Sequence, residues 1–202
     1  DSLGDYHVDE IVILRPVRED DSLASFESDL RIIRSLKTQT PISFGGGIRT
    51  LEYLLLLKDL PIERLVLSSA FIQADRVLIE AAVSLFGKQA IQCLLPLQVK
   101  DNRINVFNSS KAEFLDVSEL NVTLIDDLAN EVIIYDTNHD GLYDSFDHSL
   151  LLDQPFSVEK LIVSGGIGLG TSRKVSPEIG SLLVDNRALH KEYAIKGYRN
   201  AQ

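Results

Sequence analysis

Two glycine-rich segments are the parts of this sequence whose residue types could bind a ligand. Gly45, Gly46 and Gly47 follow a short apolar run, and Gly165 and Gly166 follow another apolar run in the second half of the chain. Glycine lets the backbone approach a phosphate group closely, and amides at the start of a helix supply donors for its oxygens. Glycines after a strand can also serve only to make a tight turn. Because the two copies have the same setting, we expect phosphate binding at one or both.

The acidic segment 136–147 offers a second kind of chemistry, because its oxygen-bearing side chains have the spacing of a calcium loop. These side chains are Asp136, Asn138, Asp140, Asp144 and Asp147. The run before the segment is strand-like where a calcium loop would follow a helix, and the last ligand position carries aspartate instead of glutamate. Calcium binding is therefore kept as an alternative, and His139 beside Asp140 is a candidate for contact with a substrate.

The elements that would position these segments recur in the two halves of the chain. The matching pairs are Asp9–Ile13 with Asn130–Ile134 (130 − 9 = 121), Ile42–Ile48 with Ile162–Gly168 (162 − 42 = 120) and, more faintly, Leu65–Ala70 with Leu182–Arg187 (182 − 65 = 117). Three matches in the same order at nearly one spacing indicate two duplicated half-domains.

Short β-branched runs alternate with helical patterns, which is typical of a parallel sheet with crossover helices. The expected strands are Ile11–Leu14, Ile42–Phe44, Leu65–Leu67, Ile91–Leu95, Val132–Tyr135, Leu161–Val163 and Leu182–Val184. The expected helices are Leu23–Leu36, Leu51–Leu57 and Arg76–Phe86, with an extra hairpin over Asn102–Lys111. In the duplicated scheme the partner of the fourth strand would fall before Asp1. We therefore expect an α/β fold, a reduced TIM-type (βα)8 barrel that lacks the first strand and helix, as one domain over residues 1–202.

Composition excludes some classes of function. A net charge of −10 and a pI near 4.8 argue against a nucleic-acid-binding surface. No apolar run is long enough to cross a membrane, and no signal peptide is evident. The single cysteine, Cys93, lies in an apolar run and is expected to be a buried, inert thiol in the cytoplasm. The acidic run Glu19–Asp21 is expected in a solvent-exposed loop or helix start.

Five motifs in order resemble those of one family, the histidine-biosynthesis βα barrels. These barrels are the phosphoribosyl isomerase and the cyclase subunit of imidazole glycerol phosphate synthase. The motifs are Phe44–Thr50, Leu67–Ala70, Phe86–Ala90, His139–Gly141 and Val163–Gly168. The end of the chain, Ala194–Tyr198, is similar to cyclase-like proteins of bacterial surface-polysaccharide clusters.

The resemblance implies a substrate with two phosphates, held on opposite sides of the barrel mouth. Carried over by position, one phosphate site would use Gly46, Gly47, Ser68 and Ser69. The other would use Gly141, Gly165, Gly166, Asn186 and Arg187. The cyclase receives ammonia from a glutamine amidotransferase partner, and no cofactor or metal is implied.

The resemblance also implies two catalytic aspartates, and here the sequence departs from the family. The first belongs to the missing strand, and the position of the second falls on Pro96. An acidic residue that normally closes the second strand of the family is replaced by Arg15. Asp140 and His139 are then the catalytic candidates. Two readings stay open: a cyclase-type subunit that binds a phosphosugar or nucleotide-sugar, or an inactive scaffold barrel whose open edges are closed by a partner or a homodimer.

Overall fold

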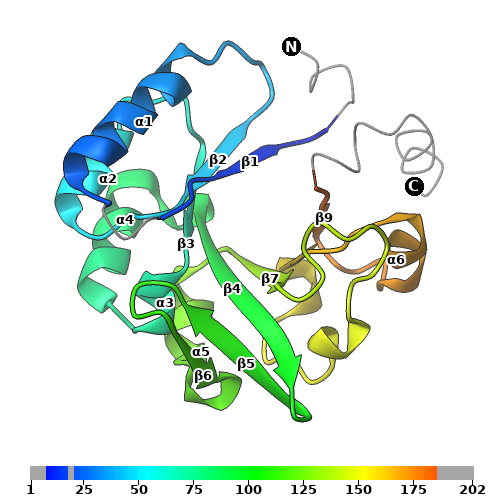
Figure 1. Cartoon of the computed structure of the whole chain (residues 1–202). Helices are drawn as coiled ribbons and strands as arrows, with labels where there is room; N and C mark the ends of the chain where they lie inside the picture. Colours follow the sequence, from blue (N-terminus) through cyan, green and yellow to red (C-terminus); the bar gives the residue numbers. More distant parts are fainter. Residues whose placement is uncertain (1–7, 18–20, 186–202) are drawn as a thin grey trace. The chain divides into compact units, whose positions relative to one another are not determined.

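The computed structural model describes residues 8–17 and 21–185 (Figure 1). Their contacts divide the chain into two compact units. Unit 1 is drawn from Asp1–Cys93 and Thr123–Asn130, and unit 2 from Leu94–Val122 and Glu131–Gln202. The single domain expected from the sequence stays a prediction. No helix in the described part of the chain is long and apolar enough to cross a membrane.

Unit 1 is built of parallel βα repeats. Its sheet order is β1-β2-β3, followed by the start of β4. The strands are β1 (Ile11–Leu14), β2 (Ile42–Gly45), β3 (Arg64–Leu67) and β4 (Ile91–Lys100). The helices are α1 (Leu23–Ser35), α2 (Leu51–Leu57), α3 (Ser69–Ile72), α4 (Arg76–Phe86), a 3-10 turn η2 (Lys88–Ala90) and nearly all of α5 (Val122–Leu128). Figure 1 shows α1, α2 and α4 beside β2 and β3.

The core of unit 1 forms because α1 carries apolar residues at helical spacing. Phe26, Leu30 and Ile33 are its buried residues. The ring of Phe26 lies edge-on to Phe44 of β2 and to Tyr53 of α2, at centroid distances of 6.1 and 4.7 Å. Replacing a fully buried phenylalanine of this kind with alanine costs about 3–5 kcal/mol. This packing fixes the beginning of α1 against the end of β2.

Unit 2 combines parallel and antiparallel pairing. The rest of β4 is followed in the sheet by β7, β8 and β9, which are parallel, while β5 and β6 form an antiparallel meander on β4. The strands are β5 (Arg103–Asn108), β6 (Glu113–Asp116), β7 (Glu131–Asp136), β8 (Leu161–Ser164) and β9 (Ser181–Leu183). The helical elements are α6 (Leu169–Lys174) and the 3-10 turns η3 (Val117–Glu119), η4 (His148–Leu151) and η5 (Val158–Lys160). In the described residues β1 and β9 are the two ends of the sheet order.

The seven parallel strands match the expected ones, and they belong to the TIM-type βα barrel class. A hairpin is present at this place, but its bounds differ from the expected Asn102–Lys111, because it pairs β4 with β5. Its turn residues, Asp101 and Asn102, have φ of 51° and 58°, as a tight two-residue hairpin turn requires. The fourth strand is longer than expected, because β4 continues beyond Leu95 to Lys100. Pro96 lies inside this strand, between the last residue paired with β3 and the first residue paired with β5. A residue without an N–H is tolerated at such a gap between two ladders.

The half-repeat is confirmed, with its glycine loops one residue out of the expected alignment. Leu14 pairs with Gly45 in unit 1, and Tyr135 pairs with Ser164 in unit 2. The structure therefore equates Gly46 with Gly165, an offset of 165 − 46 = 119 where the sequence comparison used 120. A match at 120 placed Gly45 opposite a glycine, whereas its structural counterpart is a serine at the end of β8.

Candidate functional site

The glycine loop of unit 1 follows β2 and packs against the end of β1. Gly46 has φ of 105°, and a Cβ on it would lie 2.1 Å from the carbonyl oxygen of Arg15. Only glycine fits so close an approach of two backbones. The amides of Gly46, Gly47 and Ile48 donate no hydrogen bond to any residue that the structure describes. The loop therefore offers donors to a ligand oxygen.

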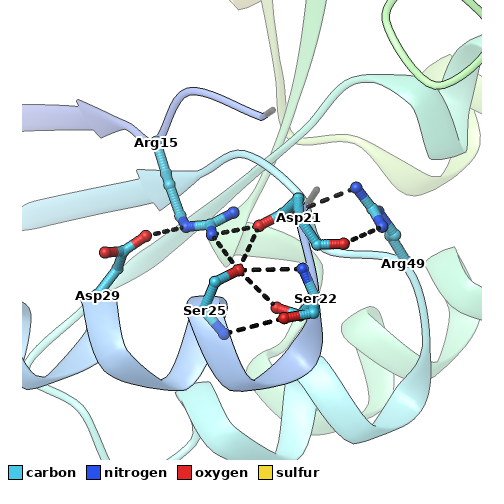
Figure 2. Close-up of polar contacts among 6 residues, drawn as sticks. All are labelled: Arg15, Asp21, Ser22, Ser25, Asp29 and Arg49. Carbon is cyan, nitrogen blue, oxygen red and sulfur yellow. Dashed lines mark hydrogen bonds and ion pairs between the residues drawn. The ribbon is translucent and has the colours of Figure 1, made fainter. Parts of the chain in front are cut away.

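Arg15 brings a buried guanidinium to this loop. Figure 2 shows the polar contacts that this guanidinium makes with Asp21 and Asp29. Its side chain is 7% exposed; Nη2 is paired with Asp21, and Nε donates to Oδ2 of Asp29 at 2.6 Å. The side chain of Asp21 is 2% exposed, and its Oδ2 also accepts from Arg49 Nη2 at 3.1 Å. Hydrogen bonding to Asp21 raises the pKa of Arg15, and hydrogen bonding from Arg15 lowers the pKa of Asp21. Both groups are therefore charged at neutral pH.

The start of α1 holds this ion pair in place. Ser22 caps the helix in a capping box with Ser25, and Ser25 Oγ donates to Asp21 Oδ1 at 2.8 Å. The guanidinium carbon of Arg15 lies 5.3 Å from the ring centroid of Phe26, a cation–π distance. The expectation of a solvated acidic run is thus wrong for Asp21, because its carboxylate bridges two arginines and accepts from Ser25.

Two buried polar atoms at this edge of unit 1 have no hydrogen-bond partner among the described residues: Arg15 Nη1 and Ser68 Oγ. Ser68 follows β3 as the N-cap of α3, but its side chain makes no capping bond. Since β2 and β3 are paired in parallel, Ser68 and Ser69 follow the same edge of the sheet as the glycine loop. A Cβ on Gly47 would lie 2.8 Å from Arg15 Nη1, so this nitrogen is beside the loop. Of the expected residues, the structure brings Gly46, Gly47, Ser68 and Ser69 to one edge.

The second glycine loop, in unit 2, packs in the same way against the end of β7. A Cβ on Gly165 would lie 2.3 Å from the carbonyl oxygen of Asp136, and one on Gly166 would lie 3.0 Å from Cβ of His139 and 2.7 Å from Ser145 Oγ. His139 is thus placed beside Gly166. Gly141, in contrast, has no atom of the described chain within 4 Å of its Cβ position apart from its own and those of its two chain neighbours.

Asp136 and His139 form a close pair at the end of β7. Oδ2 of Asp136 lies 2.7 Å from Nδ1 of His139 and accepts from the amide of Asp147 at 2.8 Å. The other oxygen, Oδ1, accepts from the amide of Asn138 at 3.1 Å. The Asp136 side chain is 2% exposed and that of His139 is 34% exposed. When a neutral histidine donates Nδ1–H to a carboxylate, its Nε2 is the nitrogen that can accept a proton.

Asp140 is exposed and lies beside the hydroxyl of Tyr135. Burial raises the pKa of Tyr135 well above its ordinary value, and its hydrogen bond to Asp140 raises that pKa further. Tyr135 is therefore a hydrogen-bond donor at neutral pH. It anchors one of the two catalytic candidates, and the other, His139, is anchored by Asp136.

The carboxylates expected for a calcium loop accept hydrogen bonds from different residues of unit 2. Asp144 accepts from the amide and hydroxyl of Thr171, at 2.6 and 3.0 Å. Asp147 accepts from the amide and hydroxyl of Ser149, at 2.9 and 2.6 Å. Among the residues that the structure describes, no three side chains of His, Cys, Asp or Glu gather where they could hold a metal ion. The segment also follows strand β7, so the geometry gives the calcium alternative no support.

Some expected site residues lie outside the described part of the chain, and some residues of the observed site were not predicted. Asn186, Arg187 and the terminal motif Ala194–Tyr198 lie outside the described residues. Arg15, Asp21 and Arg49 were missed as site residues, because Arg15 was treated only as the loss of a carboxylate. The available signal was a cation directly after an apolar strand, at the edge where the glycine loop also ends.

Comparison with known proteins places these observations in a family. The sequence profile of the family described as "Histidine biosynthesis protein" matches residues 20–172. The chain is 28% identical to a Campylobacter jejuni protein provisionally named imidazole glycerol phosphate synthase subunit hisF2, over 80% of this chain and 64% of that protein. It is 26% identical to a Leptospira interrogans protein provisionally named imidazole glycerol phosphate synthase subunit HisF, over 69% of this chain and 58% of that protein.

A third relative is named for a different activity. A Leuconostoc mesenteroides protein named 1-(5-phosphoribosyl)-5-((5-phosphoribosylamino)methylideneamino)imidazole-4-carboxamide isomerase is 28% identical, over 69% of this chain and 59% of that protein. The chain thus spans 58–64% of the length of these three relatives.

Proposed function

Because the chain belongs to the family of histidine biosynthesis proteins, we propose that it binds a phosphorylated sugar ligand as a cyclase-type subunit. The ligand would be a phosphosugar or a nucleotide-sugar. Ammonia from a glutamine amidotransferase partner would add to it, followed by ring closure or elimination. The names of the Campylobacter and Leptospira relatives, both as synthase subunits, support a partner of this kind.

The observation that carries the binding proposal is the donor set at the loop of unit 1. Free amides at Gly46–Ile48 and the buried Ser68 Oγ are donors without acceptors in the described chain. A buried donor that lacks an acceptor costs about 1–3 kcal/mol, which a phosphate oxygen would offset. The helices that follow the two glycine loops are short, with seven residues in α2 and six in α6. We therefore assign phosphate binding to loop amides and side chains, and not to a helix N-terminus.

The proposed chemistry needs a group that moves protons. Arg15 and Pro96 stand where the family resemblance implies carboxylates, and neither can act as a base at neutral pH. His139 and Asp140 are the remaining candidates. Asp136 orients the imidazole of His139, so its Nε2 would accept a proton from the attacking nitrogen, while Asp140 would assist at the same loop.

The binding proposal is tested by thermal-shift titration with ribose 5-phosphate, inorganic phosphate and a nucleotide-sugar, with ribose as the unphosphorylated control. We expect phosphorylated ligands to raise the melting temperature and ribose to leave it unchanged. Gly47→Ala should abolish the shift, because its Cβ would displace Arg15 Nη1. Gly87→Ala is the matched control: Gly87 is also at positive φ, but its Cβ would meet only the flexible side chain of Gln89. No shift with any phosphorylated ligand would contradict the proposal.

A binding barrel without catalysis is the second candidate, favoured by the arginine and proline at the two carboxylate positions. The two candidates differ in turnover of the ligand that binds. Incubation with 15N-ammonium and mass spectrometry would detect nitrogen incorporation by a cyclase-type subunit. Incorporation that His139→Gln abolishes, with binding retained, supports catalysis. Binding without incorporation supports the non-catalytic barrel.

A further inference from the structure

We propose that Arg15 contacts the ligand directly, donating from Nη1 to a phosphate oxygen at the glycine loop of unit 1, and that it gives this site a preference for the doubly charged phosphate. The inference rests on the proposed phosphate site and adds a residue to it. It also assigns a role to a side chain that the family resemblance would count as a lost carboxylate.

The first reason is that Arg15 Nη1 is buried and has no partner in the described chain, although the rest of the guanidinium is bonded. Nε is held by Asp29 and Nη2 by Asp21, so the group cannot rotate to satisfy Nη1 without breaking a charged hydrogen bond. Its stacking on Phe26 restrains it further. A side chain held this firmly, with one donor unused, is suited to bind an acceptor from outside the protein.

The second reason is the position of Nη1 beside the loop. The Cβ position of Gly47 is 2.8 Å from this nitrogen, and the loop amides from Gly46 to Ile48 are unbonded within the described residues. An oxygen accepting from the Gly47 amide would therefore lie within reach of Nη1. The absence of a side chain at position 47 is what leaves this approach open.

The third reason concerns charge. Arg15 and Arg49 are balanced by Asp21 and Asp29, so the cluster is neutral overall. Asp21 Oδ2 lies 3.0 Å from the Gly47 Cβ position, but Arg49 donates to this oxygen and offsets its charge. In a chain with a net charge of −10, anion binding must come from local donors. Charge-assisted bonds are about twice as strong as neutral ones, which favours phosphate over a sugar hydroxyl.

The test measures the dissociation constant of ribose 5-phosphate by calorimetry on the full chain. Arg15→Lys keeps the positive charge but loses the planar fork, and we expect binding at least about tenfold weaker. Arg76→Lys is the matched control, because Arg76 lies on the surface of α4 and, among the described residues, forms its ion pair with Glu80. It should bind within about twofold of the unchanged chain.

A second variant guards against misfolding of Arg15→Lys. Ser68→Ala removes a second buried donor of this site, one without a partner in the part of the chain that the structure describes, so the free protein should be as stable as before or more so. Its binding of ribose 5-phosphate should nevertheless weaken several-fold, which a purely structural role would not produce.

The preference for the dianion is tested by measuring the affinity for ribose 5-phosphate at two pH values. The second ionisation of a phosphate monoester lies near pH 6, so affinity should fall about tenfold between pH 7.5 and 5. Sulfate, a dianion throughout this range, is the control and should bind equally at both values. Within the described chain the charged groups around Arg15 are Asp21, Asp29 and Arg49. Hydrogen bonding from Arg15 lowers the pKa of Asp21, which moves its titration further below this range.

The outcomes separate this inference from the proposed function. Loss of affinity in Arg15→Lys and in Ser68→Ala, with Arg76→Lys unchanged, supports a direct contact. Unchanged affinity in Arg15→Lys overturns the inference and leaves the phosphate site standing. Absence of binding by the unchanged chain overturns both. Equal affinity at pH 5 and 7.5 overturns the preference for the dianion.

Discussion

Arg15 and Asp136 occupy equivalent positions at the ends of β1 and β7 and carry opposite charges. The carbonyl oxygen of each lies against the second residue of a glycine turn: Gly46 of Gly45-Gly46-Gly47 in unit 1, and Gly165 of Ser164-Gly165-Gly166 in unit 2. The backbone of the duplicated unit is thus retained while its chemistry differs. Unit 1 presents a guanidinium nitrogen that has no partner among the described residues, and unit 2 presents a carboxylate that orients His139.

The close approach in unit 2 predicts a large difference between two glycine-to-alanine variants. Gly165→Ala would place a Cβ 2.3 Å from the Asp136 carbonyl oxygen, whereas Gly141→Ala would meet nothing within 4 Å. Both glycines have positive φ, of 87° and 72°, so alanine is in a strained backbone conformation at either position. Gly141→Ala should cost about 1 kcal/mol and Gly165→Ala clearly more. Urea unfolding measures both, and equal losses would contradict the geometry.

The Arg15 ion pairs predict unequal effects for their two carboxylates. Asp21→Asn leaves a buried guanidinium with a weaker partner and should lower the free energy of unfolding by about 1–3 kcal/mol. Asp29→Asn removes a carboxylate that is 51% exposed and should cost under about 1 kcal/mol. Chemical denaturation of the two variants and the unchanged chain gives the comparison. A larger loss for Asp29→Asn would show that the burial of Asp21 is misassigned.

The same pair predicts how stability depends on pH. The pKa of Asp21 is lower in the folded chain than its ordinary value of 3.8, because Arg15 and Ser25 donate to its carboxylate. Its stabilising contribution is therefore complete above pH 3.8 and is lost as pH falls through the lower folded pKa. The difference in unfolding free energy between the unchanged chain and Asp21→Asn should be constant from pH 7 to about 5 and shrink in acid. A difference that grows in acid has the wrong sign for this account.

Cys93 predicts a simple measurement of thiol reactivity. The residue is fully buried in β4, and burial raises the pKa of its thiol well above the ordinary value. Because the thiolate is the reactive form, a disulfide reagent at pH 8 should react with the native chain far more slowly than with the chain in urea. As Cys93 is the sole cysteine of the sequence, the signal has one source. Equal reaction rates in the native chain and in urea would show that Cys93 is accessible to the reagent in the native chain, which contradicts its burial in β4.

The parts of the fold that the sequence predicted are those governed by local patterns. Helices α2 and α4 begin and end where helical spacing placed them, and β1 matches its apolar run. The end of β4 was missed, because Pro96 was taken as a strand end, whereas it lies between two ladders that only long-range pairing creates.

The candidate site was predictable in its loops and not in its charges. Gly46 and Gly165 could be found because close backbone approach requires glycine. The role of Asp21 could not, since its burial depends on Arg15 and on the start of α1, which are brought together only by folding. A run of acidic residues in the sequence does not indicate which of its carboxylates will form ion pairs with arginines in the fold.

Phosphate binding by the unit 1 loop can be tested directly by 15N-resolved NMR of the full chain during titration with ribose 5-phosphate. We predict saturable shifts of the Gly46, Gly47 and Ile48 amides together with the Arg15 side-chain signals, and no shifts with ribose. Saturable binding that leaves these signals unchanged, or no binding at millimolar ligand, would contradict it.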